Sequence, residues 1–187
     1  MIALAAYTFQ GCHNTPKDEK ENADSLNKSK DTSSNAAVTG GISVNNDDAK
    51  FATNAANGGL AEVALGNLAR QKSANEKIRN FGAMMVKDHS AANAELSAIA
   101  KTKNVTLPAT VSADDQKKID ALAKKSVKDF DKAYVDAMID GHKNALKLFQ
   151  DEAKNGTDAD LKAFASKTVA VVQAHLEAIS EIQASMK

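Results

Sequence analysis

The 187-residue sequence is poor in several residue types, and each shortage excludes a class of structure. It has one cysteine, Cys12, so no disulfide can form within the chain. It has no tryptophan and only two prolines, Pro16 and Pro108, which leaves long stretches without the residue that interrupts helices. Alanine is abundant, and alanine loses no side-chain entropy in a helix. The composition therefore predicts a helical protein whose stability depends on its core alone.

The sequence also lacks an excess of either charge. Lys plus Arg and Asp plus Glu number 24 each, so the formal net charge is zero. A surface that binds nucleic acid normally appears as a basic excess or a basic stripe, whereas basic and acidic residues are interleaved here. The charge pattern therefore argues against a nucleic-acid partner.

Residues 1–12, MIALAAYTFQGC, form an apolar segment that ends in Gly11 and Cys12. The segment is too short to span a bilayer and lacks the basic start of a signal peptide, which is consistent with a start codon assigned too late. Its Gly-Cys end resembles a bacterial lipobox, in which Cys12 would carry the lipid. Phe9 and Gln10 depart from the Leu and the small residue usual there. The alternative is a cytosolic protein with an apolar N-terminus and a spare thiol.

Residues 13–47 are polar and contain almost no large apolar side chain. Such a stretch cannot bury enough surface to offset its ordering entropy, so it is predicted to be a disordered tether. KDE at 17–19 resembles the Lys-acidic-acidic signal that sends some lipoproteins to the outer cell surface. A lipid anchor, a tether and a globular domain over 48–187 together predict an outer-membrane lipoprotein of the cell envelope. It would be attached to the membrane by the anchor and face the periplasm or the cell surface.

From residue 48 onward the pattern is helical. Apolar residues recur at spacings of three and four, as in amphipathic helices that face a core. Long helices are predicted over 48–72, 74–103, 127–154 and 158–185, with a short helix over 113–124 before the third long one. Short links make the first two and the last two long helices antiparallel. The expected fold is all-α, an up-down antiparallel four-helix bundle.

Helix starts and close contacts also have sequence signals. A Ser or Thr followed three residues later by an acidic residue is typical of a helix start. This pattern occurs at Ser73 with Glu76, Ser112 with Asp115, Ser126 with Asp129, and Thr157 with Asp160. Glycines inside the first two long helices weaken them and indicate close helix–helix approach. They are Gly58, Gly59, Gly66 and Gly82.

Each long helix carries one ligand-capable residue on its apolar stripe. These residues are Glu62, His89, His142 and His175. At a rise of about 1.5 Å per residue, all four can gather at one level near the middle of the bundle. Imidazoles and a carboxylate that converge from facing helices are the ingredients of a transition-metal site. A hydrogen-bonded network of the same four residues without metal also satisfies the pattern.

Further residues near these positions are candidates for the same site. Met85 and Met138 each precede a histidine by one turn, where a thioether either favours copper or simply fills the core. Tyr134 lies two turns from His142 and either hydrogen-bonds to the site or packs with its hydroxyl at the rim. Asp88 points off the stripe, where it either orients a side chain or is solvated.

Four segments in order resemble a known family. They are NGGLAEVALGNLA, FGAMMVKDHSAANAEL, FDKAYVDAMIDGHKNALKLF and LKAFASKTVAVVQAHLEAI. They closely resemble the bacterial domain-of-unknown-function family 4142 (DUF4142), which is grouped with ferritin-like proteins and often found as exported or outer-membrane proteins. The resemblance covers nearly all of 48–185 and implies a ferritin-like four-helix bundle without an established activity. Gly141 departs from the Asp that the family commonly has before the His.

The ferritin-like group suggests a test for a di-iron site. Such sites use a Glu from each of two helices and a Glu-x-x-His from each of the other two. Val86 and Val172 stand three residues before His89 and His175, so only Glu62 remains. The bridging carboxylates are missing, and a nitrogen-rich mononuclear site for zinc, copper or iron is the expectation instead.

The sequence gives little support to an enzyme. No Ser or Cys stands beside a His in a recognisable nucleophile motif, and no glycine-rich phosphate loop is present. The leading hypothesis is an exported lipoprotein that captures or stores a metal ion or small cofactor at Glu62, His89, His142 and His175. An envelope structural or interaction module with a metal-free polar network is the alternative, and an oxidoreductase would require redox-active iron or copper. The protein partner and the choice between monomer and dimer stay open.

Overall fold

The computed structural model describes residues 18–30 and 44–186, and within these ranges it contains helices and no strand. The helices are α1 (Glu19–Lys30), α3 (Asn46–Lys72), α4 (Glu76–Thr102), α5 (Ala113–Ala123), α6 (Val127–Asn155) and α7 (Ala159–Ser185). The predicted all-helical class is confirmed. Every predicted helix end from residue 48 onward agrees with the structure to within two residues. The lipobox prediction at Cys12 lies outside the described residues.

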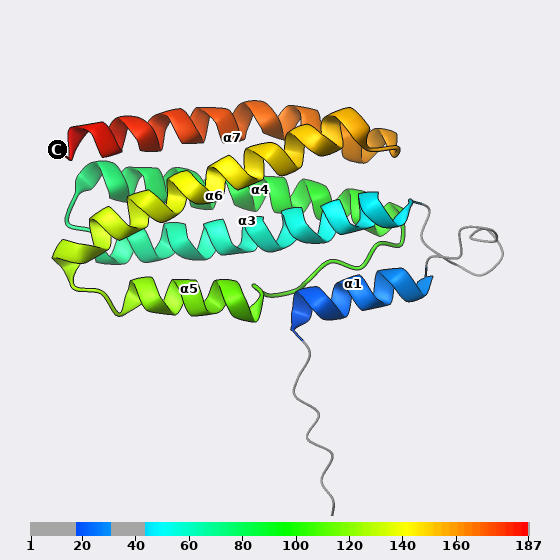
Figure 1. Cartoon of the computed structure of the whole chain (residues 1–187), viewed down its shortest axis with the longest axis horizontal. Coiled ribbons are helices and arrows are strands. Elements are labelled where there is room, and N and C mark those ends of the chain that lie inside the picture. The colour runs from blue at the N-terminus through cyan, green and yellow to red at the C-terminus, as the bar shows by residue number, and fades with distance from the viewer. Residues whose placement is uncertain (1–17, 31–43, 187) are drawn as a thin grey trace, which may run out of the picture.

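The four long helices α3, α4, α6 and α7 lie side by side as a helical bundle (Figure 1). Residues 73–75 join α3 to α4, and residues 156–158 join α6 to α7, so each pair packs antiparallel along its length. The two pairs pack against each other, with α3 in contact with α6 and α4 in contact with α7.

The connection between the two pairs runs along the outside of the bundle. After α4, residues 103–112 and α5 carry the chain back to the end at which α4 began (Figure 1). Helices α4 and α6 therefore run in the same direction, and the expected up-down order is wrong at this crossover. The sequence pattern sets the faces of helices but not the path of a long connection between them.

Two of the predicted helix starts are present as expected. The Ser112 hydroxyl accepts from the amide of Asp115 at 3.2 Å, and the Ser126 hydroxyl accepts from the amide of Asp129 at 3.2 Å. The helix start at Ser112 is also joined to α3, because the Ser112 amide donates to the side-chain oxygen of Asn57 at 2.7 Å. This contact holds the start of α5 against the bundle.

The other two predicted caps are wrong. Asn75, not Ser73, caps α4, and Asp158, not Thr157, caps α7. Asn and Asp are at least as good at this position, and the Thr157 hydroxyl is engaged elsewhere, since it donates to buried Asp48 at 2.8 Å. Asp48 also accepts from the amides of Thr157 and Asp158, which fastens the α6–α7 turn to the start of α3.

Part of the predicted tether is ordered helix. Helix α1 lies within residues 13–47 and packs against α3, so the prediction of disorder is wrong for residues 19–30. Asn27 is buried and pairs with the backbone of Thr106, donating to its carbonyl at 2.8 Å and accepting from its amide at 2.7 Å. Buried Ala23 and the hydrogen bond from Thr53 to Asp24 complete the attachment. The low apolar content of this segment did not predict a helix, because polar contacts attach α1 to the rest of the protein.

The core consists of two apolar clusters separated by a polar layer. One cluster contains Phe51, Leu96, Phe149, Phe164 and Val172, among others. The other contains Phe81, Met85, Tyr134, Met138 and Ile179, among others. Along α4, α6 and α7, one histidine lies between the residues of the two clusters, so the imidazoles lie at a middle level of the bundle.

Small residues bring α3 and α4 together near this level. A Cβ added to Gly82 would lie 2.6 Å from the carbonyl oxygen of Gly66, and the converse contact is the same. A Cβ on Gly59 would collide with the side chain of Asn93. The prediction of close approach is correct for these glycines and wrong for Gly58, where a Cβ would meet nothing within 4 Å.

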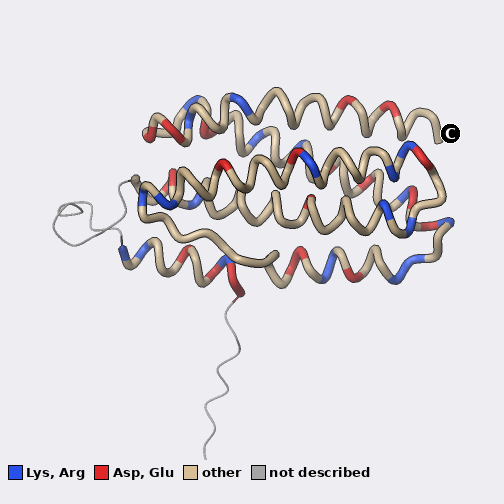
Figure 2. The backbone as a smooth tube through the Cα atoms, turned by 180° about the vertical axis from the view of Figure 1, so that it is seen from behind, with Lys and Arg blue, Asp and Glu red and all other residues tan. Residues whose placement is uncertain are grey.

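Charged residues of both signs are distributed along the helices (Figure 2). The pattern matches the interleaving in the sequence. None of the helices within 18–30 and 44–186 combines the length and the apolar character needed to cross a membrane.

Candidate metal centre

Helices α4, α6 and α7 bring three histidines together in the core. His89, His142 and His175 each offer a ring nitrogen, and these nitrogens lie within 4.8 Å of one another. The ring centroids are 5.3 to 5.9 Å apart. His142 and His175 are 1% and 2% exposed, so two of the three imidazoles are removed from water.

A backbone carbonyl sets the orientation of His142. Its Nδ1 lies 2.8 Å from the carbonyl oxygen of Met138, one turn earlier in α6. A carbonyl only accepts, so Nδ1 carries the proton and Nε2 keeps its lone pair. Within the described part of the chain, this buried Nε2 has no hydrogen-bond partner.

A carboxylate sets the orientation of His175. Its Nε2 donates to Oδ2 of Asp88 at 3.0 Å, across the α4–α7 interface. The lone pair is therefore on Nδ1, and no described residue makes a hydrogen bond to it. Of the two roles expected for Asp88, orienting a side chain is the one observed, although the carboxylate is also 30% exposed.

His89 completes the cluster from α4. Its Nε2 is buried and likewise has no partner among residues 18–30 and 44–186. Burial, followed by the neighbouring imidazoles, lowers the pKa of His89 to about 3. Burial also lowers the pKa of His142 to about 4, and it lowers the pKa of His175 despite the opposing effect of Asp88. The rings are neutral at pH 7, and the neutral ring is the form that binds metals.

Glu62 lies beside the cluster rather than within it. Its Oε1 is 3.8 Å from Nδ1 of His142, too far for a hydrogen bond, and its carboxylate is not part of the group within 4.8 Å. Burial, reinforced by the charge of Asp115, raises the pKa of Glu62 to about 8. A Cβ on Gly141 would lie 3.3 Å from Oε1, so the absence of a side chain there leaves room for Glu62.

Tyr134 lies close enough to Glu62 for the two groups to interact electrostatically. It is fully buried and stacks on Phe130 with 5.6 Å between ring centroids. Its hydroxyl has no hydrogen-bond partner in the described ranges. Burial and the Glu62 charge both raise the pKa of Tyr134. Tyr134 packs in the core, but its hydroxyl is buried rather than at a rim, so the expected position of the hydroxyl is wrong. The hydrogen bond to a site ligand stays a prediction.

The two methionines lie in the apolar cluster next to the imidazoles. Met85 and Met138 are 0% and 1% exposed and pack among Phe81 and its neighbours. This is the core-filling role for which methionine is well suited. Their role as thioether ligands stays a prediction.

One residue of the site was not predicted. The Phe81 ring lies 6.1 Å from the His142 ring and 6.5 Å from the His175 ring. The sequence places Phe81 two turns before His89 on the stripe, which indicates a core position but not which histidines it meets. The pairing depends on how α4 packs against α6 and α7.

The donor set fits a mononuclear transition-metal site. Zinc–imidazole bonds of about 2.0–2.1 Å place tetrahedral ligand nitrogens about 3.3 Å apart, so the rings would move inward by roughly an ångström. Hydrogen bonds from the non-ligating nitrogens to a carboxylate and a carbonyl are usual for metal-bound histidines. A di-iron site does not fit, because Val86 and Val172 occupy the positions of the required carboxylates.

Comparison with known proteins agrees with the sequence motifs. Residues 17–182 match the family described as Domain of unknown function (DUF4142). The chain belongs to this family. The DUF4142 match begins ahead of α1, so it includes the helix that polar contacts attach to the bundle.

A solved structure has a similar fold. It is the crystal structure of a DUF305 fragment from Deinococcus radiodurans, with a TM-score of 0.66 and 9% sequence identity. The alignment covers 74% of this chain and 96% of that chain. At this identity the likeness concerns the fold alone. No curated protein matches the chain.

Proposed function

We propose that this DUF4142 protein binds one transition-metal ion through His89, His142 and His175. The observation that carries the proposal is that the three rings each offer a nitrogen within 4.8 Å of the others, and that each ring also has a buried nitrogen without a hydrogen-bond partner among the described residues. A buried polar atom without a partner costs free energy, and a bound cation would remove that cost at all three nitrogens together.

A carboxylate from Glu62 is the proposed fourth ligand. Its Oε1 lies 3.8 Å from Nδ1 of His142, the nitrogen that donates to the Met138 carbonyl, so a rotation of the flexible Glu62 side chain would be needed to reach the metal. Ionisation of Glu62 is unfavourable in the buried site without a cation and favourable beside one. Three imidazoles and a carboxylate suit zinc, copper or iron, and copper(II) is expected to bind most tightly of the divalent ions.

We also propose that the helices form a ferritin-like four-helix bundle whose metal site differs from the di-iron type. Four long helices with one long crossover between the pairs support this fold. The centre is nitrogen-rich, which favours capture or storage of a metal over oxygen activation by bridging carboxylates.

A metal-free polar network is the weaker candidate. Such a network would pair the imidazoles with one another or with Glu62. The structure instead leaves a nitrogen of each ring without a partner in the described ranges and holds Glu62 at 3.8 Å from His142. The observed geometry supports a ligand set better than a network.

Metal analysis tests the proposed function. The full-length protein would be purified, loaded with zinc, copper(II) or iron(II), desalted and analysed for metal content and thermal stability. We expect about one metal ion per chain and a higher melting temperature, and both should be lost in His89→Ala. His13→Ala is the matched control, because it removes the fourth histidine of the chain, which is not one of the three proposed ligands. Absence of both binding and stabilisation for all three metals would refute the proposal.

We further propose that the chain is an exported lipoprotein anchored through Cys12 in the outer membrane. The apolar residues before Gly11-Cys12 support this location. Expression in a Gram-negative host with labelled palmitate should label the protein and recover it with the membranes. Cys12→Ser should abolish the label and release the protein from the membranes. Label retained in Cys12→Ser, or a soluble wild-type protein, would contradict the proposed anchor.

A further inference from the structure

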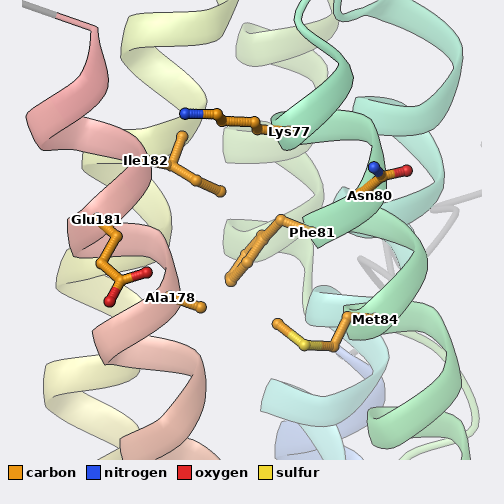
Figure 3. Close-up of a pocket in the computed structure, with 7 residues that line it drawn as sticks. All are labelled: Lys77, Asn80, Phe81, Met84, Ala178, Glu181 and Ile182. Carbon is orange, nitrogen blue, oxygen red and sulfur yellow. The ribbon is translucent and has the colours of Figure 1, made fainter.

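A hollow on the surface between α4 and α7 lies next to the histidine cluster. It has a volume of about 360 Å³, within the range of small-molecule sites. Figure 3 shows Phe81 and Met84 of α4 facing Ala178 of α7 across the hollow, with the Glu181 carboxylate on the α7 side. Its lining is therefore apolar at the centre and charged at the edge.

Phe81 separates this hollow from the imidazoles. It lines the hollow, yet it is only 3% exposed, so most of its surface faces inward. On that inner side its ring lies 6.1 Å from His142, 6.5 Å from His175 and 6.5 Å from Tyr134. One aromatic ring thus contacts both the surface hollow and the candidate ligands.

We propose that the hollow is the port through which the metal ion reaches the cluster, and that Phe81 is the gate. This inference rests on the proposed function of the three histidines. A buried site needs an access path, and rotation of one side chain at the floor of an existing hollow requires less rearrangement than separation of two helices. The Glu181 carboxylate and the Met84 thioether of the lining attract a cation, and the carboxylate offsets the charge of the Lys77 ammonium, which lines the same hollow.

The approach past Asp88 is less suitable. Asp88 is 30% exposed, but its carboxylate is bonded to Nε2 of His175, which carries the proton of that ring. A cation that arrived there would meet a hydrogen-bonded pair rather than a free lone pair. The hollow at Phe81 has no such pair at its floor.

Access can be measured without any metal. Diethyl pyrocarbonate modifies neutral imidazoles, and peptide mapping would give a separate rate for each histidine of the full-length protein. Phe81→Ala should raise the modification rates of His142 and His175 by about tenfold or more. Ala178→Phe, which fills the hollow without removing a core side chain, should lower both rates.

Phe164→Ala is the matched control. Phe164 is also 3% exposed, but it belongs to the other apolar cluster. If it accelerates modification as much as Phe81→Ala does, general loosening of the bundle controls access and the port is refuted. Unchanged rates in both Phe81→Ala and Ala178→Phe would also refute it. Phe81→Leu, expected to give an intermediate rate, serves if Phe81→Ala does not fold.

A second arm uses zinc and a chelator. Phe81→Ala should speed zinc uptake and chelator-driven release by a similar factor, because a gate changes the barrier and not the equilibrium. A lower affinity with unchanged rates would show that Phe81 supports the ligands rather than gating them. Failure of wild-type protein to bind any metal would refute the proposed function, whereas the modification rates would still decide whether the hollow is the path to the cluster.

Discussion

Asp88 and His175 are joined by a hydrogen bond of 3.0 Å that crosses from α4 to α7. The bond selects the tautomer of His175 and leaves its buried Nδ1 lone pair without a partner among the described residues. Asp88 immediately precedes His89, so α4 supplies both a candidate ligand and the group that orients another ligand. The orientation of His175 on α7 therefore depends on a residue of α4.

Removal of this carboxylate should weaken metal binding. In Asp88→Ala, His175 can adopt either tautomer and rotate, so we expect zinc affinity to fall about 10- to 100-fold. Competition with a chromophoric chelator would measure it. Asp140→Ala, which removes an exposed carboxylate two residues before His142, is the control and should have little effect. Equal zinc affinities for Asp88→Ala and the wild type would show that the Asp88 carboxylate makes no contribution to metal binding.

Acid should destabilise the metal-free protein. The pKa values of His89 and His142 are lowered from 6.5 to about 3 and about 4, so between those values and 6.5 the unfolded chain binds more protons than the folded one. Their stabilising effect is fully present above pH 6.5 and is lost as the pH falls through this window, by about 1.4 kcal/mol per pH unit for one proton. Above pH 4.5 the raised pKa values of Glu62 and Glu152 act in the opposite direction, so urea unfolding with a chelator present should show the decline most clearly below pH 4.5. His142→Leu should flatten the acidic decline, and an unchanged slope would contradict the assignment.

Alkali should also destabilise the metal-free protein, for the opposite reason. The pKa of Glu62 is raised from 4.5 to about 8, so its contribution is fully present below pH 4.5 and is lost as the pH rises through 8. Glu152, whose pKa burial raises to about 7, acts in the same direction. Glu62→Gln should therefore reduce, but not abolish, the decline in unfolding free energy between pH 6 and 8. The same decline in Glu62→Gln and wild type would exclude Glu62 as its source.

The contact between α3 and α4 should tolerate no side chain at Gly82. In Gly82→Ala the new Cβ would lie 2.6 Å from the Gly66 carbonyl oxygen, so the helices must separate, at a cost of about 1–3 kcal/mol. Gly58→Ala is the matched control in the interior of α3. Nothing lies within 4 Å of its Cβ, so it should stabilise by up to about 1 kcal/mol through helix propensity. Denaturant unfolding of both variants would test this, and equal effects would contradict the close contact.

Tyr134→Phe should separate the two roles considered for Tyr134. Its buried hydroxyl has no partner among the described residues, so its removal should leave the stability of the metal-free protein unchanged or raised by up to about 1 kcal/mol. If the hydroxyl bonds to Glu62 or another ligand once metal is bound, the same variant should lower zinc affinity. Destabilisation of the metal-free protein by more than about 1 kcal/mol would show that the hydroxyl already has a partner.

Much of the local structure was predictable because it depends on neighbours in the sequence. Helix periodicity located α3 to α7 to within two residues, and the Ser112 and Ser126 caps followed from spacing alone. Two other caps were misplaced, since buried Asp48 engages Thr157 from a helix more than a hundred residues away. Helix α1 was missed for a similar reason, because Asn27 gains its partner in Thr106 only when the chain has folded.

For the candidate site, the sequence by itself determined which residues enter the core and at what level. His89, His142 and His175 lie on the apolar stripes of amphipathic helices, and the rise of a helix is constant. Only the tertiary structure decided how close the three imidazoles lie, that Asp88 orients His175, and that Glu62 lies beside the cluster rather than within it. These relationships depend on rotamers and on the packing of separate helices, and neither is encoded in the spacing along a single helix.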